Sequence, residues 1–392
     1  MARVIGLIVA SFSAVDYGKL HYRDLELAKT ISLKHNFGNY DAVMPLTDKM
    51  KSELAWWIQN LRQQSRVIDR SNPSNIIETD ASFLGWGAKY LTQKIGGRWT
   101  VEESQSNINV LELLAIFRAL RSFQKSIVST HVKVMPDNTT AVSYINNMGG
   151  TVSPQCNRIA VDIWTWCITH DIWLTAAHIA GKHNLEADEA SRKFKDNLEW
   201  KLDENIFSKI CDLWGVPDLD CFASRLNAQL KNYCSWKPDP DCSYLDAFTF
   251  DWKIVDNVYV YPPFSLLGRC VQKMRRDMAK GIIIAPLWPT QSWFPRLMEI
   301  LVETPVIVRK KKGLLKLPNQ EVTHPLEGKL RLIACKVSAT VSDNVAFQKT
   351  LAKFSCSPGN QEQKSSITHT LTGGFATVLK EKFLQFRQLW KR

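Results

Sequence analysis

Paired cysteines, long apolar runs and a secretory leader are the features that this sequence lacks. It has nine cysteines, an odd number, and no C-x-x-C pair. That usage argues against a disulfide framework and a structural zinc site, and it favours a reducing compartment. No run reaches the ~18 apolar residues needed to span a bilayer, and the apolar start at residues 3–10 has only one arginine, too few for a signal peptide. We therefore expect a cytoplasmic or nuclear protein with no membrane partner.

The composition supports packed domains and a charged partner. The chain has 392 residues, of which 45% are hydrophobic and 10% aromatic, and these values exclude a disordered chain. This length predicts two or three domains. The formal net charge of +12 suits a polyanion such as nucleic acid. A basic balance is also common in proteins that never bind nucleic acid.

Four carboxylates, Asp80, Glu112, Asp137 and Asp188, lie in four separate predicted elements: a strand, a helix, a strand end and a helix. Acids packed together repel one another unless divalent cations share the site. Oxygen ligands select Mg²⁺ or Mn²⁺, and two such ions can activate a water and stabilise the leaving oxygen of a phosphodiester. The pattern predicts a nuclease. Taken singly, each acid could instead be a turn residue or a favourable charge near a helix start.

Residues 75–195 resemble the RNase H domain of retroelement polyproteins. The matching motifs are Thr79-Asp80-Ala81-Ser82, Gly85-Trp86-Gly87, Glu112-Leu113-Leu114-Ala115, Asp137-Asn138-Thr139-Thr140-Ala141-Val142 and His178-x-x-Gly181-x-x-Asn184-x-x-Ala187-Asp188-x-x-Ser191-Arg192. All four acidic positions of that family's site are filled in order, and His178 matches a histidine thought to assist product release. The resemblance implies two bound Mg²⁺ or Mn²⁺ ions and cleavage of the RNA strand of an RNA–DNA hybrid. A basic remnant that binds nucleic acid without cutting it remains the alternative.

The local pattern from residue 76 to 179 predicts an α/β domain. We expect strands at 76–81, 85–91, 97–101, 131–136 and 172–179, with Gly96-Gly97 as a hairpin turn, and helices at 109–123, from 138, and at 154–170. This alternation predicts a mixed sheet with flanking helices, as in the RNase H-like fold. Glu78 shares a strand face with Asp80, and we expect it to be solvated rather than to act as a fifth ligand. We expect the tryptophans at 164, 166 and 173 to lie in the core. The candidates for phosphate contacts are Arg98, Lys133, Lys182 and Arg192.

Residues 1–70 are predicted to be mostly helical, with Thr47 as an N-cap. They resemble the tail that joins a retroelement reverse transcriptase to its RNase H. The paired-aspartate motif of a polymerase does not occur in the sequence. We therefore expect the downstream part of a larger polyprotein, with upstream reverse-transcriptase segments as partners.

Residues 205–310 contain two apolar runs that end in prolines, at 258–263 and 281–289, and these predict buried parallel strands of a second α/β domain. This part resembles the phage-type DNA adenine-N6 methyltransferases and the methylase-like domain of DIRS-like (tyrosine-recombinase) retrotransposons. The resemblance implies a Rossmann-like fold, S-adenosylmethionine as cofactor and DNA as partner. Asp220 would belong to the methyl-donor loop, and Tyr261-Pro262-Pro263-Phe264 to the motif that holds the target amine.

Tyr261 departs from that motif, which begins with Asn or Asp. The amine loses its expected acceptor, although Phe264 could still stack on a flipped base. We interpret the second domain as methylase-like in fold and inactive, with binding of S-adenosylmethionine left open.

Residues 311–392 are predicted to be a basic linker and an amphipathic tail. The run at 309–312 is typical of a solvated loop, and a nucleic-acid contact or nuclear signal is the alternative. Residues 356–373 have linker composition. Leu379, Phe383, Phe386 and Trp390 fall at helical spacing among basic residues, and this helix could dock on a partner such as a recombinase of the same element.

Overall fold

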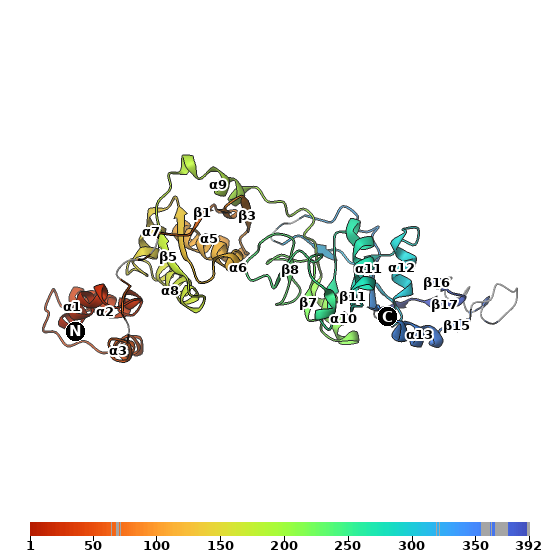
Figure 1. The fold of residues 1–392 in the computed structure, drawn as a ribbon, viewed down its shortest axis with the longest axis horizontal. Coiled ribbons are helices and arrows are strands. Elements are labelled where there is room, and N and C mark those ends of the chain that lie inside the picture. Colours follow the sequence, from red (N-terminus) through yellow and green to blue (C-terminus); the bar gives the residue numbers. More distant parts are fainter. Residues whose placement is uncertain are drawn as a thin grey trace. The chain divides into compact units, whose positions relative to one another are not determined.

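The computed structural model describes residues 1–353 except 64, 68, 69, 71, 319 and 321, together with residues 361, 363–364 and 375–389. The chain divides into two compact units, Met1–Phe194 and Lys195–Arg392 (Figure 1). Each unit has its own sheet and its own hydrophobic core.

Helices are the main elements in the described part of residues 1–70, as predicted. The helices are α1 (Ala2–Ala10), α2 (Arg23–His35) and α3 (Asp48–Asn60). Thr47 caps α3, because its hydroxyl accepts the Met50 N–H at 3.3 Å. The first N–H groups of α2, at Asp24 and Leu25, donate instead to the buried Glu53 carboxylate at 3.0 and 2.9 Å. A side chain of α3 thus provides the acceptor for N–H groups in the first turn of α2, which have no partner within their own helix.

The first unit is built on a five-stranded sheet with the order β3-β2-β1-β4-β5. Its strands are β1 (Asn75–Ala81), β2 (Gly85–Tyr90), β3 (Gln93–Arg98), β4 (His131–Pro136) and β5 (Trp173–Ala176). β1 is antiparallel to β2 and parallel to β4, and β4 is parallel to β5. The predicted mixed sheet is therefore confirmed.

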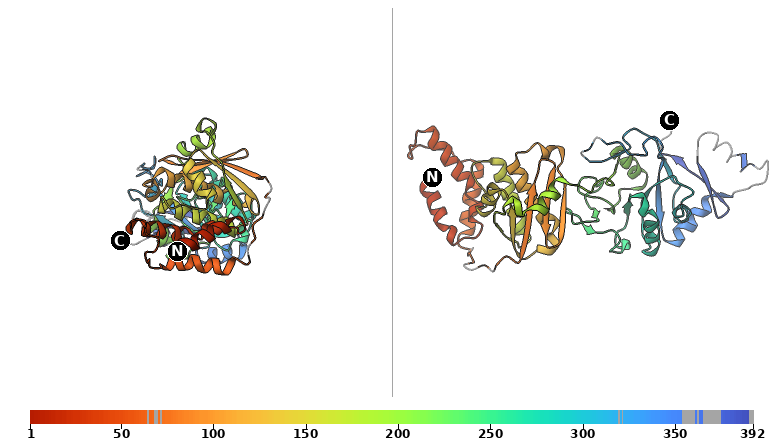
Figure 2. Two further views of the ribbon diagram at one scale, coloured as in Figure 1. Left: turned by 90° about the vertical axis from the view of Figure 1, so that its left-hand side faces the viewer. Right: turned by 90° about the horizontal axis from the view of Figure 1, so that it is seen from above.

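Helices cover both faces of this sheet (Figure 2). The α-helices of this part of the chain are α4 (Val101–Ser104), α5 (Ile108–Ser122), α6 (Gln124–Ile127), α7 (Thr139–Asn146), α8 (Pro154–Thr169) and α9 (Leu185–Arg192). Trp86 and Ala88 of β2 pack into the core with Leu113 and Leu120 of α5. Side chains alternate along a strand, so Gly87 lies on the opposite face, where the backbone of α9 covers it.

The prediction for β3 was wrong. Gly96 and Gly97 lie inside this strand, paired with Gly87 and Trp86, and the hairpin turns at Leu91, whose φ is +54°. A Cβ on Gly96 would lie 2.4 Å from the Ala190 carbonyl oxygen of α9. Gly96 is needed for the close approach of a helix rather than for a turn.

The second unit has a six-stranded sheet with the order β18-β12-β14-β11-β10-β7. Its strands are β7 (Leu219–Asp220), β10 (Val258–Val260), β11 (Lys280–Pro286), β12 (Val306–Val308), β14 (Leu332–Ser338) and β18 (Arg387–Gln388). The predicted parallel pairing of the two apolar runs is confirmed, since β10 is parallel to β11 and also to β7.

Alternate residues of these strands enter two cores. Ile283 packs with α11 (Leu267–Arg276) and α12 (Trp293–Glu299), whereas Ile282 packs with α10 (Glu204–Trp214). The sheet is thus covered on both faces, which explains why its strands read as continuous apolar runs. The remaining elements are α13 (Val341–Thr350), β6 (Lys201–Leu202), β8 (Cys234–Ser235), β9 (Tyr244–Leu245), β13 (Leu315–Lys316), β15 (Ala352–Lys353), β16 (Ala376–Leu379) and β17 (Lys382–Gln385).

Two predictions about the C-terminal part were wrong. A linker was expected from residue 311, but β14 is a buried strand that pairs with β11 along its whole length. A helix was expected at 379–390, but β16 and β17 form a hairpin there. Lys380 and Glu381 both have positive φ and supply its two-residue turn. Most of the predicted linker at 356–373, and Trp390, lie outside the described residues.

The absences noted in the sequence carry into the structure. Within the described part of the chain, the eight cysteines are free thiols. No helix there combines the length and the apolar character that a bilayer span requires.

Candidate active site

Two of the predicted acids lie at the same edge of the first sheet. β1 and β4 are parallel neighbours, and Thr79 is in register with Pro136. Asp80 follows Thr79, and Asp137 follows Pro136 directly after β4. The two acids therefore lie side by side at the carboxyl ends of these strands. Asp80 is 3% exposed, and Asp137 is half-buried.

The third acid comes from a helix. Asn107 caps α5, since its side chain accepts the Asn109 N–H at 2.9 Å, and Glu112 lies in the second turn, 3% exposed. Ligand oxygens of Asp80, Glu112 and Asp137 all lie within 4.8 Å of one another. The structure thus brings together three of the four predicted acids from three elements far apart in the sequence.

This concentration of acid is reflected in the pKa values. Burial and, to a smaller extent, the charges of Asp80 and Asp137 together raise the pKa of Glu112 to about 9. Burial also raises the pKa of Asp80 to about 6, opposed by a hydrogen bond from Ser191. The Oε2 atom of Glu112 is buried and has no hydrogen-bond partner among the residues that the structure describes. An unpartnered buried oxygen among acids suits a divalent cation.

Asp188 lies outside the group of three. It is carried by α9, is half-exposed, and accepts a hydrogen bond from Arg192 Nε at 2.8 Å. Its charge still contributes to the raised pKa of Asp80. The charge of Asp188, the fourth predicted ligand, therefore acts on the site, although its carboxylate is paired with the Arg192 guanidinium.

His178 lies on an exposed loop beside the triad. Its Nε2 is 3.1 Å from the backbone oxygen of Asp137. The same loop passes close to the Asp137 carboxylate, since a Cβ on Gly181 would lie 3.4 Å from Oδ2. The sequence motif around His178 is therefore placed next to the acids.

Other candidates of the sequence are placed as follows. Glu78, predicted to be solvated, is only partly exposed, pairs with Lys89 at 3.7 Å, and does not belong to the group of three acids. Trp164 is buried, and its Nε1 donates to the Ile145 carbonyl at 2.9 Å, which confirms its place in the core. Arg98 lies over the ring of Phe194, 4.6 Å from its centroid.

The sequence motifs include Gly87, Asn184 and Ser191, but sequence reasoning missed their role, which is to hold α9 against the sheet. Gly87 leaves no room for a side chain, since a Cβ there would lie 2.1 Å from the Ala187 carbonyl oxygen. Ser191 donates to Asp80 Oδ2 at 2.7 Å, and Asn184 donates to the Thr79 carbonyl at 2.9 Å. Glycines inside strands are a signal for such an approach. Asn184 stands at the N-cap position of α9, but its side chain makes no capping hydrogen bond and donates to β1 instead.

The second unit contains a cavity of about 650 Å³. It lies at the carboxyl ends of the parallel strands β7 and β10, the usual ligand edge of an α/β sheet. Predicted residues that line it are Tyr261, Pro262, Pro263 and Phe264, next to Cys221. The cavity is also lined by aromatic and charged side chains from scattered loops and from α11, among them Trp200, Phe222, Trp236, Phe248, Arg269 and His324. No spacing in the sequence connects these residues.

Asp220 and Tyr261, two of the predicted cofactor-binding residues, have different surroundings. The buried Asp220 carboxylate accepts the N–H groups of Phe222 at 3.2 Å and Gln229 at 3.1 Å, so its oxygens organise the loop. Burial raises the pKa of Asp220 to about 6. Burial also raises the pKa of Tyr261, whose ring meets Phe264 edge-on at 6.4 Å.

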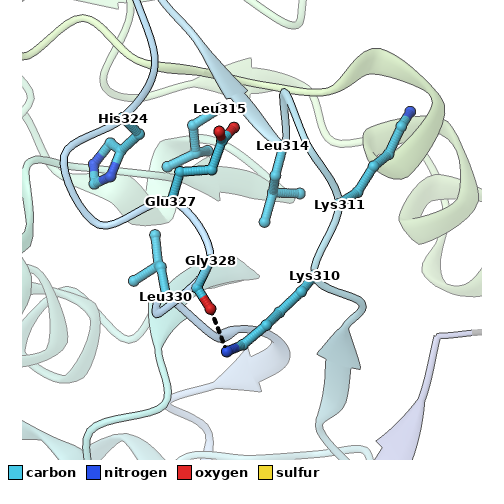
Figure 3. Close-up of a pocket in the computed structure, with 8 residues that line it drawn as sticks. All are labelled: Lys310, Lys311, Leu314, Leu315, His324, Glu327, Gly328 and Leu330. Carbon is cyan, nitrogen blue, oxygen red and sulfur yellow. Dashed lines mark hydrogen bonds between the residues drawn. The ribbon is translucent and has the colours of Figure 1, made fainter.

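Two lysines of the basic run after β12 have partners within the second unit. Lys310 donates to the Gly328 carbonyl at 2.5 Å, and Lys311 pairs with Asp203 at 3.2 Å. Figure 3 shows Lys310 reaching across a small pocket toward Gly328, with Leu330 and His324 in its wall. The loop that was predicted to be solvated is thus partly fixed by contacts of Lys310 and Lys311 with other residues of the second unit.

Comparison with known proteins gives partial relatives. No family model matches the sequence. Over 167 residues the chain is 25% identical to the enzymatic polyprotein of Carnation etched ring virus, in an alignment that covers 37% of this chain and 25% of the polyprotein. The chain thus spans about a quarter of the length of the curated relative that it matches.

Solved structures are similar to parts of the chain. LC11-RNase H1, isolated from compost and crystallised with an RNA/DNA hybrid, is 21% identical, with 30% of this chain and 93% of that chain covered and a TM-score of 0.27. RNase H1 from Halobacterium salinarum is 16% identical over 30% and 96% of the two chains, with a TM-score of 0.25. The prototype foamy virus protease–reverse transcriptase is 12% identical over 42% and 25%, with a TM-score of 0.20. The first unit has the predicted mixed sheet with flanking helices. A methyltransferase fold for the second unit stays a prediction.

Proposed function

We propose that this chain is a metal-dependent endoribonuclease of the RNase H type, which hydrolyses the RNA strand of RNA–DNA hybrids. The observation that carries the proposal is the meeting of Asp80, Glu112 and Asp137 within 4.8 Å, with one buried Glu112 oxygen unpartnered. Buried acids this close together raise one another's pKa, and bound cations offset the repulsion between their ionised forms.

In this proposal the three acids hold two Mg²⁺ or Mn²⁺ ions, and Asp188 completes the site. The ions would supply an activated water and stabilisation of the leaving oxygen. His178, exposed beside Asp137, assists release of the cleaved strand. Recognition of RNA rests on contacts to its 2′-hydroxyl groups, which DNA lacks.

The direct test uses a hybrid whose RNA strand carries an end label. We expect the full chain to cut this strand internally when Mg²⁺ or Mn²⁺ is present, and to leave the labelled RNA intact in EDTA. Duplex DNA and duplex RNA of the same sequence are the matched control substrates, and both should stay uncut. Salt-sensitive binding without metal-dependent cleavage would instead identify a nucleic-acid-binding remnant.

We also infer that the chain is a segment of a retroelement polyprotein of the DIRS-like type. Two things support this inference: the alignment with a viral polyprotein, and the order of a helical segment, an RNase H-like domain and a second α/β unit. The partners that follow from it are RNA–DNA hybrid, DNA, upstream reverse-transcriptase segments and a recombinase.

The cavity of the second unit supports a second candidate function, the binding of S-adenosylmethionine by a methyltransferase-like domain. Its size of about 650 Å³ fits such a ligand, and its place at the ends of β7 and β10 is the expected one. Calorimetry with S-adenosylmethionine should show binding in the micromolar range, weakened at least tenfold by Phe264→Ala. Ile254→Ala, at an exposed position outside the cavity, is the control. The absence of heat at millimolar ligand would exclude this function.

A further inference from the structure

Ser191 makes a contact that the proposed chemistry does not yet explain. The residue is fully buried on α9. Its Oγ lies 2.7 Å from Asp80 Oδ2 and 2.9 Å from the backbone oxygen of Asp188. A hydroxyl has one proton to donate, and a carboxylate is a stronger acceptor than a carbonyl. The proton of Ser191 is therefore directed at the acid of β1.

The helix that carries Ser191 is held against the end of β1 at several points. Asn184, just before α9, donates to the Thr79 carbonyl at 2.9 Å. Ser82, just after β1, donates to the Ser191 carbonyl at 2.7 Å. Both donors are buried. Asp80 lies between Thr79 and Ser82, so the strand end and the helix are held in one relative position around this acid.

Two glycines make this contact sterically possible. Asp80 is in register with Gly87 of β2, and Gly87 with Gly96 of β3. A Cβ on Gly87 would lie 2.5 Å from the Ser191 N atom, and one on Gly96 would lie 2.4 Å from the Ala190 carbonyl oxygen. The two glycines therefore present no side chain to α9. Its backbone packs directly against the sheet, close enough for the Ser191 hydroxyl to contact Asp80.

We propose that Ser191 is a positioning residue of the nuclease site, whose hydroxyl fixes the orientation of the Asp80 carboxylate for metal binding. The inference rests on the proposed function. A carboxylate that rotates freely loses part of its affinity for a cation, because binding must then also order it. Groups that hydrogen-bond a metal ligand are worth about 10- to 100-fold in metal affinity. The same contact links Asp80 to α9, which also carries Asp188.

The test compares metal requirement with folding. In the full chain, Ser191→Ala should weaken Mn²⁺ binding, measured by calorimetry, about tenfold or more. It should raise by the same factor the Mg²⁺ concentration that gives half-maximal cleavage of hybrid, while KM for the hybrid at saturating Mg²⁺ stays unchanged. Ser191→Cys, which is similar in size and a weaker donor, should give intermediate values, and it serves as the measured variant if Ser191→Ala does not fold.

Ser82→Ala is the matched control. It removes the hydrogen bond to the Ser191 carbonyl and leaves the Ser191 hydroxyl in place, so it should lower Tm with little change in Mn²⁺ affinity. Equal Mn²⁺ affinities of wild type, Ser191→Ala and Ser191→Cys would overturn the inference and leave the nuclease proposal standing. A wild-type protein that neither binds Mn²⁺ nor cleaves hybrid would overturn both.

Discussion

Replacement of Asp137 by asparagine is expected to lower the rate of hybrid cleavage about 10³-fold. The amide keeps the size of the side chain but loses the negative charge, and Asp137 forms the group of acids together with Asp80 and Glu112. Metal-bound charge stabilisation is worth several kcal/mol, and each ~1.4 kcal/mol changes the rate tenfold. The measurement is kcat/KM on a labelled hybrid at saturating Mg²⁺.

Glu78→Gln is the control for this substitution. Glu78 is also a carboxylate of the first sheet, but it pairs with Lys89 at 3.7 Å near the surface. Partly exposed ion pairs contribute little to stability, so this variant should cleave at close to the wild-type rate. If the two variants lost the same amount of activity, or if wild type cut no faster than Asp137→Asn, the assignment of the triad would be wrong.

Glu112→Gln is expected to make the metal-free protein more stable while it abolishes cleavage. Burial and the charges of Asp80 and Asp137 raise the pKa of Glu112 to about 9, so the folded state tolerates its charge poorly. The neutral amide removes this penalty, which is on the order of 5 kcal/mol at pH 8, at ~1.4 kcal/mol per pKa unit over the interval between the unfolded pKa of 4.5 and that pH. Urea unfolding in EDTA measures the gain.

The pH dependence of that gain has a definite sign. A carboxyl group with a raised folded-state pKa contributes stability that is fully present below its unfolded pKa, near 4.5, and is lost as the pH rises toward 9. The two proteins should therefore be similar in stability at pH 4 and diverge as the pH increases. Mg²⁺ should raise the Tm of wild type at pH 8 and leave that of Glu112→Gln unchanged. The exposed Glu102 provides the control variant, Glu102→Gln, for which neither effect is expected; a Glu112→Gln protein with wild-type stability at pH 8 would contradict the explanation.

Local sequence patterns predicted most elements of the first unit. The strand at 131–136 and the helices at 108–122 and 154–169 lie within a residue of their expected bounds. Their signals are local, since apolar spacing and caps such as Ser153, which accepts the Cys156 N–H at 3.3 Å, act over a few residues. The tail was mistaken for a helix because Leu379, Phe383 and Phe386 also fit a hairpin whose turn depends on positive φ at Lys380 and Glu381.

By itself the sequence determined the identity and order of the acids, the alternation of strands and helices, and the absence of paired cysteines. Only the tertiary structure decided that Asp80, Glu112 and Asp137 form one group while Asp188 pairs with Arg192. It also placed the Ser191 hydroxyl on Asp80 and the two glycines under α9. The physical reason is the distance along the chain over which each signal acts. Caps and periodicity act over a few residues, whereas the geometry of the charged site depends on strand register and helix packing between segments far apart in the sequence, such as those of Asp80 and Ser191.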